Sequence, residues 1–351
     1  MAAALALAER GRGRTWPNPC VGCVIVRDGV VVGRGWTQPG GRPHAEAVAL
    51  AQAGEGARGA TAYVTLEPCA HASARGPACA DLLVAAGVGR VVAAIRDPDP
   101  RTDGSGLARL VAAGIATVAG VLADAAERSM AGFLTRQRLG RPFVTLKLAT
   151  SLDGCIALVS GESRWITGPE ARAHAHVERA RSDAILVGRG TWAADRPRLD
   201  VRLPGLEDRS PLRVILTSAS LPRSPHPRES GDPSSAVSSH DQGGDRRAPS
   251  ELDPRSRGDE GWEVISAPKD IATLPADWLL VEGGARTAAA FLHADLVDRL
   301  MLYRAPILIG GGLPAIADLG MTTLSEAHGR WALTDARRLG SDRLEVYDRT
   351  R

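Results

Sequence analysis

The spacing of hydrophobic and polar residues over residues 1–140 predicts a small α/β domain. Short apolar runs bounded by glycine, proline or aspartate are typical of strands, whereas apolar residues three or four apart that end at a glycine are typical of helices. Asp28-Gly29, between two apolar runs, predicts the turn of a β-hairpin. The expected strands are 21–26, 30–35, 62–66, 90–95 and 115–119, and the expected helices are 45–53, 79–86, 107–113 and one connecting helix over 124–140.

A second α/β pattern starts at Arg141-Pro142, where we place a domain boundary. Its expected strands are 143–149, 184–187, 212–216, 278–281 and 300–306, and its expected helices are 169–181 and 286–293. A chain of 351 residues fits two domains of ordinary size, here 1–140 and 141–351. Residues 222–261 contain almost no apolar side chains, so burial cannot offset the entropy of ordering, and we predict a disordered surface insertion there.

Composition and charge narrow the class of function. Hydrophobic residues make up 44% of the chain and charged residues 24%, a balance typical of globular proteins. The net charge is only +3, aromatic residues make up 4%, and no basic block is interleaved with aromatics, so no nucleic-acid partner is expected. The opening residues lack the basic leader of a signal peptide, and no apolar run reaches the ~18–20 residues of a membrane span. We therefore expect a cytoplasmic protein that acts on a small molecule, without a membrane partner.

Five cysteines, an odd number in a chain with no export signal, favour metal binding or burial over a disulfide framework. His44, Cys69 and Cys79 supply one imidazole and two thiolates, which suit a catalytic zinc site with an open fourth position. Glu46, two residues after His44 at the start of an expected helix, is placed to move a proton from the attacking water to the leaving ammonia. This order of residues predicts a zinc-dependent deaminase in which Glu46 is catalytic.

Each of these motifs also has an ordinary alternative. A single His-Ala-Glu can arise by chance, and a buried cysteine is often a core residue. The three ligands together, in this order, favour zinc. Cys79 is the least typical ligand because nine residues separate it from Cys69, and His71 within that loop is an alternative. A fourth protein ligand would make the zinc structural and the protein a binding module.

Residues upstream of the zinc motif allow two interpretations each. Asn18, between two prolines, is placed either to bind the edge of a substrate ring or to form an Asx turn. Cys20 and Cys23 have the spacing of a redox pair or a second zinc site. Cys23 falls in an apolar strand, so burial is the expected role for that residue.

The motifs together resemble the bifunctional deaminase–reductase of riboflavin biosynthesis. The residues that carry the resemblance are Pro17-Asn18-Pro19, Val21-Gly22, His44-Ala45-Glu46, Thr65-Leu66-Glu67-Pro68-Cys69, Lys147-Leu148-Ala149, Ser151-Leu152-Asp153-Gly154, the segment 161–167, Val187-Gly188 and Val281-Glu282-Gly283-Gly284. The resemblance implies an N-terminal cytidine deaminase-like α/β/α sandwich and a C-terminal dihydrofolate reductase-like α/β domain. It further implies that the first domain deaminates a diaminopyrimidinone with a phosphoribosylamino group, and that the second reduces the ribosyl group to ribityl.

The same resemblance implies the cofactors, one Zn²⁺ per chain and NADPH, together with a homo-oligomer and the residues of the reductase site. The implied NADPH contacts are Ala149, Trp165, Thr191, Asp195 and Gly284, and the implied substrate contacts are Ser163, Arg179, Leu199, Arg202 and Glu282. Two of these substrate contacts are arginines, whose planar forks suit a phosphate. Gly283-Gly284 lets backbone amides approach an anion.

Two other functions are compatible with the sequence. A zinc deaminase that edits nucleic acids uses the same chemistry on flipped bases, but it would need a basic, aromatic surface. The chain would act as a deaminase alone if the insertion had inactivated the reductase half. Turnover of the expected substrate would distinguish these functions.

Overall fold

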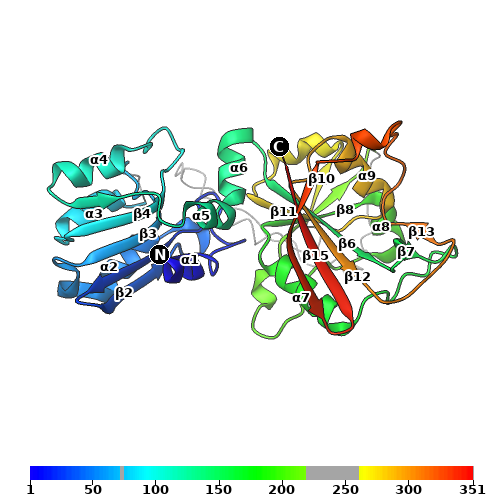
Figure 1. The fold of residues 1–351 in the computed structure, drawn as a ribbon, viewed down its shortest axis with the longest axis horizontal. Coiled ribbons are helices and arrows are strands. Elements are labelled where there is room, and N and C mark those ends of the chain that lie inside the picture. The colour runs from blue at the N-terminus through cyan, green and yellow to red at the C-terminus, as the bar shows by residue number, and fades with distance from the viewer. Residues whose placement is uncertain (72–74, 219–260, 351) are drawn as a thin grey trace, which may run out of the picture.

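The computed structural model describes residues 1–71, 75–218 and 261–350. These residues form two α/β units that lie side by side, with helices α5 (Ala123–Ser129) and α6 (Ala131–Leu139) between them (Figure 1). Within the described ranges, no helix is both long enough and apolar enough to cross a membrane. The prediction of a disordered insertion at 222–261 lies outside the described residues, apart from Gly261, which directly precedes strand β10 (Trp262–Ile265).

The first sheet has the strand order β2-β1-β3-β4-β5. Its strands are β1 (Gly22–Arg27), β2 (Val30–Trp36), β3 (Thr61–Leu66), β4 (Arg90–Ile95) and β5 (Ala116–Val118). β1 pairs antiparallel with β2 and with β3, whereas β3, β4 and β5 are parallel. The hairpin predicted around Asp28-Gly29 is confirmed.

Helices cover both faces of this sheet. A Cβ added at Gly22 would lie 1.9 Å from Ala4 O in α1 (Ala2–Ala8), and one at Gly35 would lie 2.1 Å from Ala45 O in α2 (Ala45–Ala53). Gly22 pairs with Trp36, the residue after Gly35, and neighbouring residues of a strand point to opposite faces of the sheet. Helices α1 and α2 therefore cover opposite faces. α3 (Cys79–Ala85) packs beside α2, α4 (Ser105–Ala112) beside α3, and α5 beside α1. This is the α/β/α sandwich that the sequence predicts.

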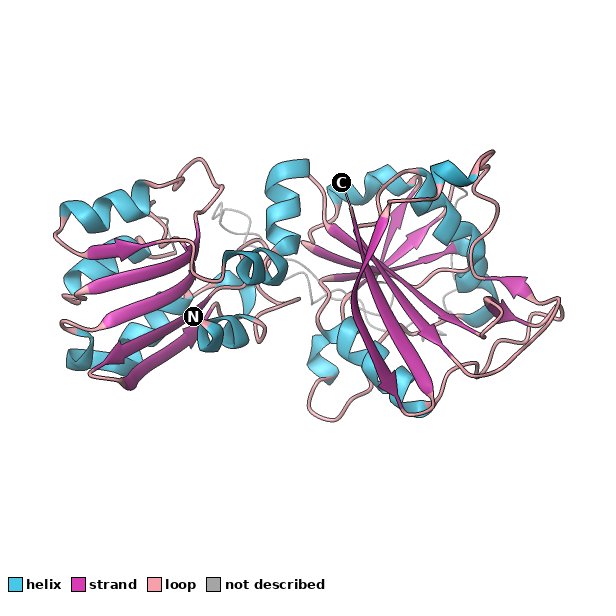
Figure 2. Ribbon diagram, viewed as in Figure 1, coloured by secondary structure: helices cyan, strands magenta, loops and turns pink. Residues whose placement is uncertain are grey.

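The second sheet has eight strands in the order β10-β9-β8-β11-β6-β12-β15-β14 (Figure 2). Besides β10, they are β6 (Phe143–Thr150), β8 (Ala184–Gly188), β9 (Leu212–Leu216), β11 (Trp278–Val281), β12 (Arg299–Arg304), β14 (Trp331–Leu339) and β15 (Asp342–Arg349). The strands from β10 to β12 are parallel, and the β14–β15 hairpin is antiparallel at one edge. A small separate sheet pairs β7 (Cys155–Ala157) with β13 (Leu313–Pro314).

Three helices complete the second unit: α7 (Pro169–Ala180), α8 (Arg189–Asp195) and α9 (Ala285–His293). α7 packs on Tyr303 and Leu344, whereas α9 packs through Phe291 on Leu146 and Leu186 of the opposite face. The short 3-10 helices of the described chain are Pro39–Gly41, Gly54–Ala57, Glu207–Arg209, Pro268–Thr273 and Leu324–Glu326. The two-domain α/β class expected from the sequence is therefore present.

The single helix expected over 124–140 is wrong, because the chain forms α5 and α6 with a break at Met130. Met130 has φ −106° and ψ 17°, outside the helical region, and its side chain is fully buried. Beyond the break, a Cβ on Gly132 would lie 2.6 Å from the indole of Trp278. The bend therefore lays α6 closely against the second unit.

Several charged side chains contact the other unit. The Arg12 guanidinium stacks on the ring of Trp278 at 3.8 Å from the centroid, and Arg181 pairs with Glu9. Arg136 on α6 donates hydrogen bonds to carbonyl oxygens of the second unit, those of Ala272 (2.9 Å), Leu274 (2.9 Å) and Ala276. These contacts join α1 and α6 to the second sheet.

Candidate functional site

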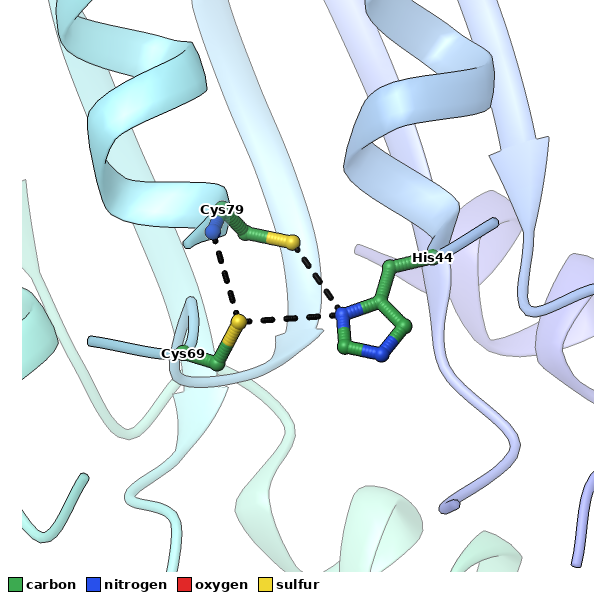
Figure 3. A group of neighbouring side chains, drawn as sticks. All are labelled: His44, Cys69 and Cys79. Atoms are coloured by element: carbon green, nitrogen blue, oxygen red, sulfur yellow. Dashed lines mark hydrogen bonds between the residues drawn. The ribbon is translucent and has the colours of Figure 1, made fainter. Parts of the chain in front are cut away.

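The three predicted zinc ligands come from distant parts of the sequence and meet at one end of the first sheet (Figure 3). His44 precedes α2, Cys69 follows β3, and Cys79 is the first residue of α3. His44 Nδ1 lies 3.3 Å from Cys79 Sγ and 3.7 Å from Cys69 Sγ, and the three ligand atoms lie within 4.8 Å of one another. This spacing fits one tetrahedral zinc with bonds of about 2.0–2.3 Å.

The two thiols differ in acidity, because the hydrogen bond to Cys69 and burial raise the pKa of Cys79 well above its usual range. A hydrogen bond from Cys79 lowers the pKa of Cys69 to about 4. The backbone amide of Cys79 donates to Cys69 Sγ at 3.3 Å and holds that thiolate in place. Two thiolates and an imidazole are the donors that zinc prefers over hard cations. No second group of three potential ligands occurs among the described residues.

Asn18 and His71 lie beside the cluster and have different partners. Asn18 Nδ2 is 2.9 Å from His44 Nε2 and donates to Gly41 O at 2.8 Å, so it orients the ring with Nδ1 toward the thiols. His71 Nδ1 instead lies 3.4 Å from Thr102 Oγ1 and is not part of the ligand group. Part of the loop between Cys69 and Cys79, residues 72–74, lies outside the described residues.

Glu46 lies in the first turn of α2, directly beside the cluster, and is only 4% exposed. Burial raises the pKa of its carboxyl to about 7, although His44 acts in the opposite direction. A carboxyl group with a pKa near neutrality accepts and releases a proton readily, as a general acid–base must. The structure therefore places next to the predicted metal the residue that the sequence predicts to be catalytic.

A buried carboxylate braces the loop that carries Cys69, and sequence reasoning did not identify it as a functional residue. Glu67 is 2% exposed, and its two oxygens accept hydrogen bonds from the backbone amides of Asp97 (3.2 Å), Gly104 (3.0 Å) and Leu107 (3.1 Å). Such charge-assisted bonds are stronger than neutral ones. They fix the segment 97–107 against the loop that carries Cys69.

Gly106→Ala should weaken zinc binding without removing any ligand. A Cβ at position 106 would lie 1.9 Å from Pro68 O, and Pro68 precedes Cys69, so the zinc loop must shift. We expect zinc affinity to fall by at least about tenfold, in the range found when groups that orient ligands are changed. Competition with a chromogenic chelator measures it. Gly56→Ala, whose Cβ would make only contacts of 3.5 Å or more, should bind zinc normally; equal affinities in the two variants would contradict the prediction.

Arg179 and Glu282, two predicted substrate contacts, form an ion pair in the second unit whose side chains are only 13% and 10% exposed. Arg179 Nε and Nη2 each donate to one oxygen of Glu282 at 2.8 Å. Burial would raise the pKa of Glu282, but the charges of Arg179 and Lys147 outweigh it and lower that pKa to about 2. Glu282 directly follows β11, so this charge pair lies at the carboxyl end of the parallel strands, where open α/β sheets bind ligands.

The loop 199–202 is attached to α7 beside this pair. Arg179 Nη1 donates to Asp200 O at 3.0 Å, and the amide of Arg202 donates to His176 Nδ1 at 3.3 Å. Leu199 is 3% exposed and anchors the loop, and the Arg202 side chain lies 3.5 Å from an Asp200 oxygen. Sequence reasoning missed His176, although its spacing of three from Arg179 on a helix placed both on one face.

The predicted NADPH contacts surround the same edge of the sheet. Gly284 caps α9, and a Cβ there would lie 3.7 Å from Thr191 Oγ1 of α8, so these two residues are brought together. Arg164, next to Trp165, pairs with Asp195 at 3.4 Å. The start of α9 offers unpaired backbone amides to a pyrophosphate, so the residues present fit a dinucleotide.

The other predicted contacts lie around this site with different exposures. Trp165 is 66% exposed, with the Arg172 guanidinium 4.6 Å from its ring centroid. Ser163 lies in the same exposed loop. Ala149, near the end of β6, packs with Tyr303 on the face covered by α7.

Cys20 and Cys23 are not zinc ligands in this arrangement. Both are buried in the core of the first unit, and burial raises the pKa of Cys20 to about 12. Neither residue belongs to the ligand group found among the described residues. The burial expected for Cys23 is therefore confirmed.

The fold and the site define a zinc deaminase joined to a second enzymatic α/β domain, and comparisons with known proteins give the same division. Residues 1–95 match the family model "Cytidine and deoxycytidylate deaminase zinc-binding region", and residues 142–344 match "RibD C-terminal domain". The riboflavin biosynthesis protein RibD of Escherichia coli is 42% identical over 97% of this chain and 96% of its own length. That of Haemophilus influenzae is 42% identical over 99% and 96%.

Solved structures agree with this result. Acinetobacter baumannii RibD has a TM-score of 0.81 at 37% identity, covering 100% of this chain and 98% of its own. A deaminase/reductase from Thermotoga maritima has a TM-score of 0.80 at 30% identity, covering 100% and 97%. The chain belongs to the RibD family of riboflavin biosynthesis proteins. It is a bifunctional enzyme with a zinc-binding deaminase domain and an NADPH-dependent reductase domain, and it acts on a small molecule.

Proposed function

We propose that residues 1–140 deaminate a diaminopyrimidinone that carries a phosphoribosylamino group, and that residues 141–351 then reduce the ribosyl group to ribityl with NADPH. The observation that carries the proposal is the cluster of His44, Cys69 and Cys79 beside Glu46, in one chain with the Arg179–Glu282 site. The Thermotoga maritima protein is named as a deaminase of a phosphoribosylaminopyrimidine and a reductase of a phosphoribosylaminouracil. In the proposed sequence of reactions, the deaminated product of the first domain is the substrate of the second.

In the deaminase site, His44, Cys69 and Cys79 would hold the zinc. When bound, zinc supplies a Lewis acid that lowers the pKa of water at the open position. Glu46 accepts a proton from the attacking water and gives it to the amino group that leaves as ammonia. Asn18 fixes the His44 ring, and its amide oxygen would be left to contact the substrate.

In the reductase site, no nucleophile is needed, because NADPH supplies the hydride and the protein holds donor and acceptor carbons together. Arg179 keeps Glu282 ionised and holds its carboxylate in place, where it would contact the substrate. Arg202, Ser163 and Leu199 complete the substrate contacts, with the exposed Arg202 fork available to the phosphate. The NADPH contacts are Ala149, Trp165, Thr191, Asp195 and Gly284.

We also propose that the protein works in the cytoplasm as a homo-oligomer. All five cysteines are unpaired thiols in the structure, which suits a reducing compartment. The oligomer rests on likeness to the family alone. Light scattering on the purified protein measures it directly, and a monomer at micromolar concentration would refute it.

Purified enzyme given the phosphorylated diaminopyrimidinone and NADPH tests the function. We expect ammonia release and NADPH oxidation in equal amounts at completion. Ammonia without NADPH oxidation would show that the reductase half is inactive. Release of ammonia from an RNA or DNA oligonucleotide but not from this compound would favour a nucleic-acid editing deaminase instead.

A further inference from the structure

A pocket of about 330 Å³ lies between the two units and is separate from both proposed active sites. It opens beside α1 and α5, which Figure 1 shows next to the second unit. Its lining residues are Leu5, Ala6, Glu9, Arg12, Ala125, Arg128, Ser129 and Arg299. None of these residues has a role in either reaction proposed above.

Two of the charged residues in this lining already have partners. Glu9 accepts a hydrogen bond from Ser129 Oγ at 2.7 Å and pairs with Arg181. Arg299 donates two hydrogen bonds to Asp348, from Nε at 2.7 Å and from Nη2 at 3.1 Å. The charges that remain to be balanced are therefore those of two arginines, Arg12 and Arg128.

Arg12 is a buried cation with too few partners. Its side chain is only 9% exposed, and its nearest carboxylate oxygen, on Glu9, is 3.9 Å away. Within the described chain, no hydrogen bond is donated by its guanidinium, and its Nε is fully buried without an acceptor. Burial and the charge of Arg181 both lower its pKa. Leaving buried donors unpaired is costly, so an acceptor in the pocket would stabilise this arginine strongly.

Arg128 adds a second cation to the same pocket. It lies on α5, is exposed, and has no carboxylate within 4.0 Å among the residues that the structure describes. Its neighbour Arg138, by contrast, pairs with Glu127 at 3.3 Å and lines an adjacent groove rather than this pocket. Two guanidinium groups without hydrogen-bond acceptors among the described residues thus line one open pocket.

We propose that this pocket binds a phosphate group, either as inorganic phosphate or as part of a small phosphorylated metabolite. A phosphate dianion has enough oxygens to accept hydrogen bonds from both planar guanidinium groups at once. The carboxylate in the lining does not do this. Bound there, the phosphate contacts residues of α1 and α5 and lies beside Arg299 of β12. It therefore adds a bridge between the two units at the point where Arg12 stacks on Trp278.

Isothermal titration of the zinc-loaded enzyme with inorganic phosphate, in chloride buffer of matched ionic strength, tests the proposal. Arg128→Gln should weaken binding at one site per chain by at least about tenfold, because it removes charge-assisted hydrogen bonds from an exposed position. The matched control Arg138→Gln should bind as tightly as the wild type. Unchanged ammonia release in both variants would show that the protein is intact.

A third variant, Arg202→Gln, separates this pocket from the proposed reductase site. Phosphate binding that is lost with Arg202→Gln and kept with Arg128→Gln would overturn the proposal, as would the absence of binding at millimolar phosphate. Arg12→Lys keeps the positive charge but loses the planar guanidinium group. This single variant should weaken phosphate binding less than the double variant that combines it with Arg128→Gln. Ribose phosphate titrated into Arg202→Gln identifies the source: tighter binding than inorganic phosphate indicates a metabolite, and equal binding indicates inorganic phosphate.

Discussion

Replacing Glu46 with glutamine should lower ammonia release by about 10²–10⁴-fold, the range expected for the loss of a general acid–base. Glutamine has nearly the same shape, and Glu46 is not a ligand, so zinc content should stay at one ion per chain. Burial already raises the pKa of Glu46 to about 7, so a neutral side chain fits the site without cost to folding. Steady-state ammonia release, with zinc measured by atomic absorption, checks this result.

Two controls make the Glu46→Gln result specific. Glu55→Gln removes an exposed carboxylate in the same domain and should leave deamination unchanged. NADPH oxidation with the deaminated compound supplied directly should also be unchanged in Glu46→Gln, because that reaction belongs to the second unit. Normal ammonia release by Glu46→Gln would refute the proton-transfer role, and loss of zinc would show that the residue supports the metal instead.

The second large effect concerns the reductase half. Arg179→Met should abolish NADPH oxidation and destabilise the protein by about 3–5 kcal/mol, since it leaves the buried Glu282 carboxylate without its bidentate partner. The pKa of Glu282 falls on folding from its ordinary value of 4.5 to about 2. The pair's contribution to stability is therefore fully present above pH about 4.5 and lost as the pH falls toward 2. Urea unfolding at neutral pH measures the loss.

A double variant separates stability from catalysis at this pair. Arg179→Met with Glu282→Gln removes both charges, so most of the lost stability should return. NADPH oxidation should not return, because the oriented carboxylate is still absent. Recovery of activity in the double variant would show that the pair is only structural. Ammonia release should persist in both variants.

Most of the element order could be predicted because the parallel strands are short, continuous apolar runs. β4, β9 and β11 have the predicted bounds, as does α2. The meeting of His44, Cys69 and Cys79 could also be predicted, because the order of a histidine and two cysteines along the chain is specific. The structure adds that His44 and Cys79 come together at the starts of two neighbouring helices.

The elements that were missed lack a local signal. Most side chains of β14 are exposed and none is buried, and β15 provides the buried face of that hairpin. The break at Met130 is followed by the close approach of Gly132 to Trp278, a residue far away in the sequence. The same holds for the proposed reductase site: only the fold brings together Arg179, Glu282 and the loop 199–202, so their spacing in the sequence does not predict the contact.

Ammonia release before and after zinc removal, with NADPH oxidation followed in the same preparation, tests the central claim most directly. We expect chelation to abolish ammonia release and added zinc to restore it, while reduction of the supplied deaminated compound continues throughout. That result would establish a zinc deaminase and an independent reductase in one chain. Ammonia release that survives complete removal of zinc would contradict the account of the His44, Cys69 and Cys79 site.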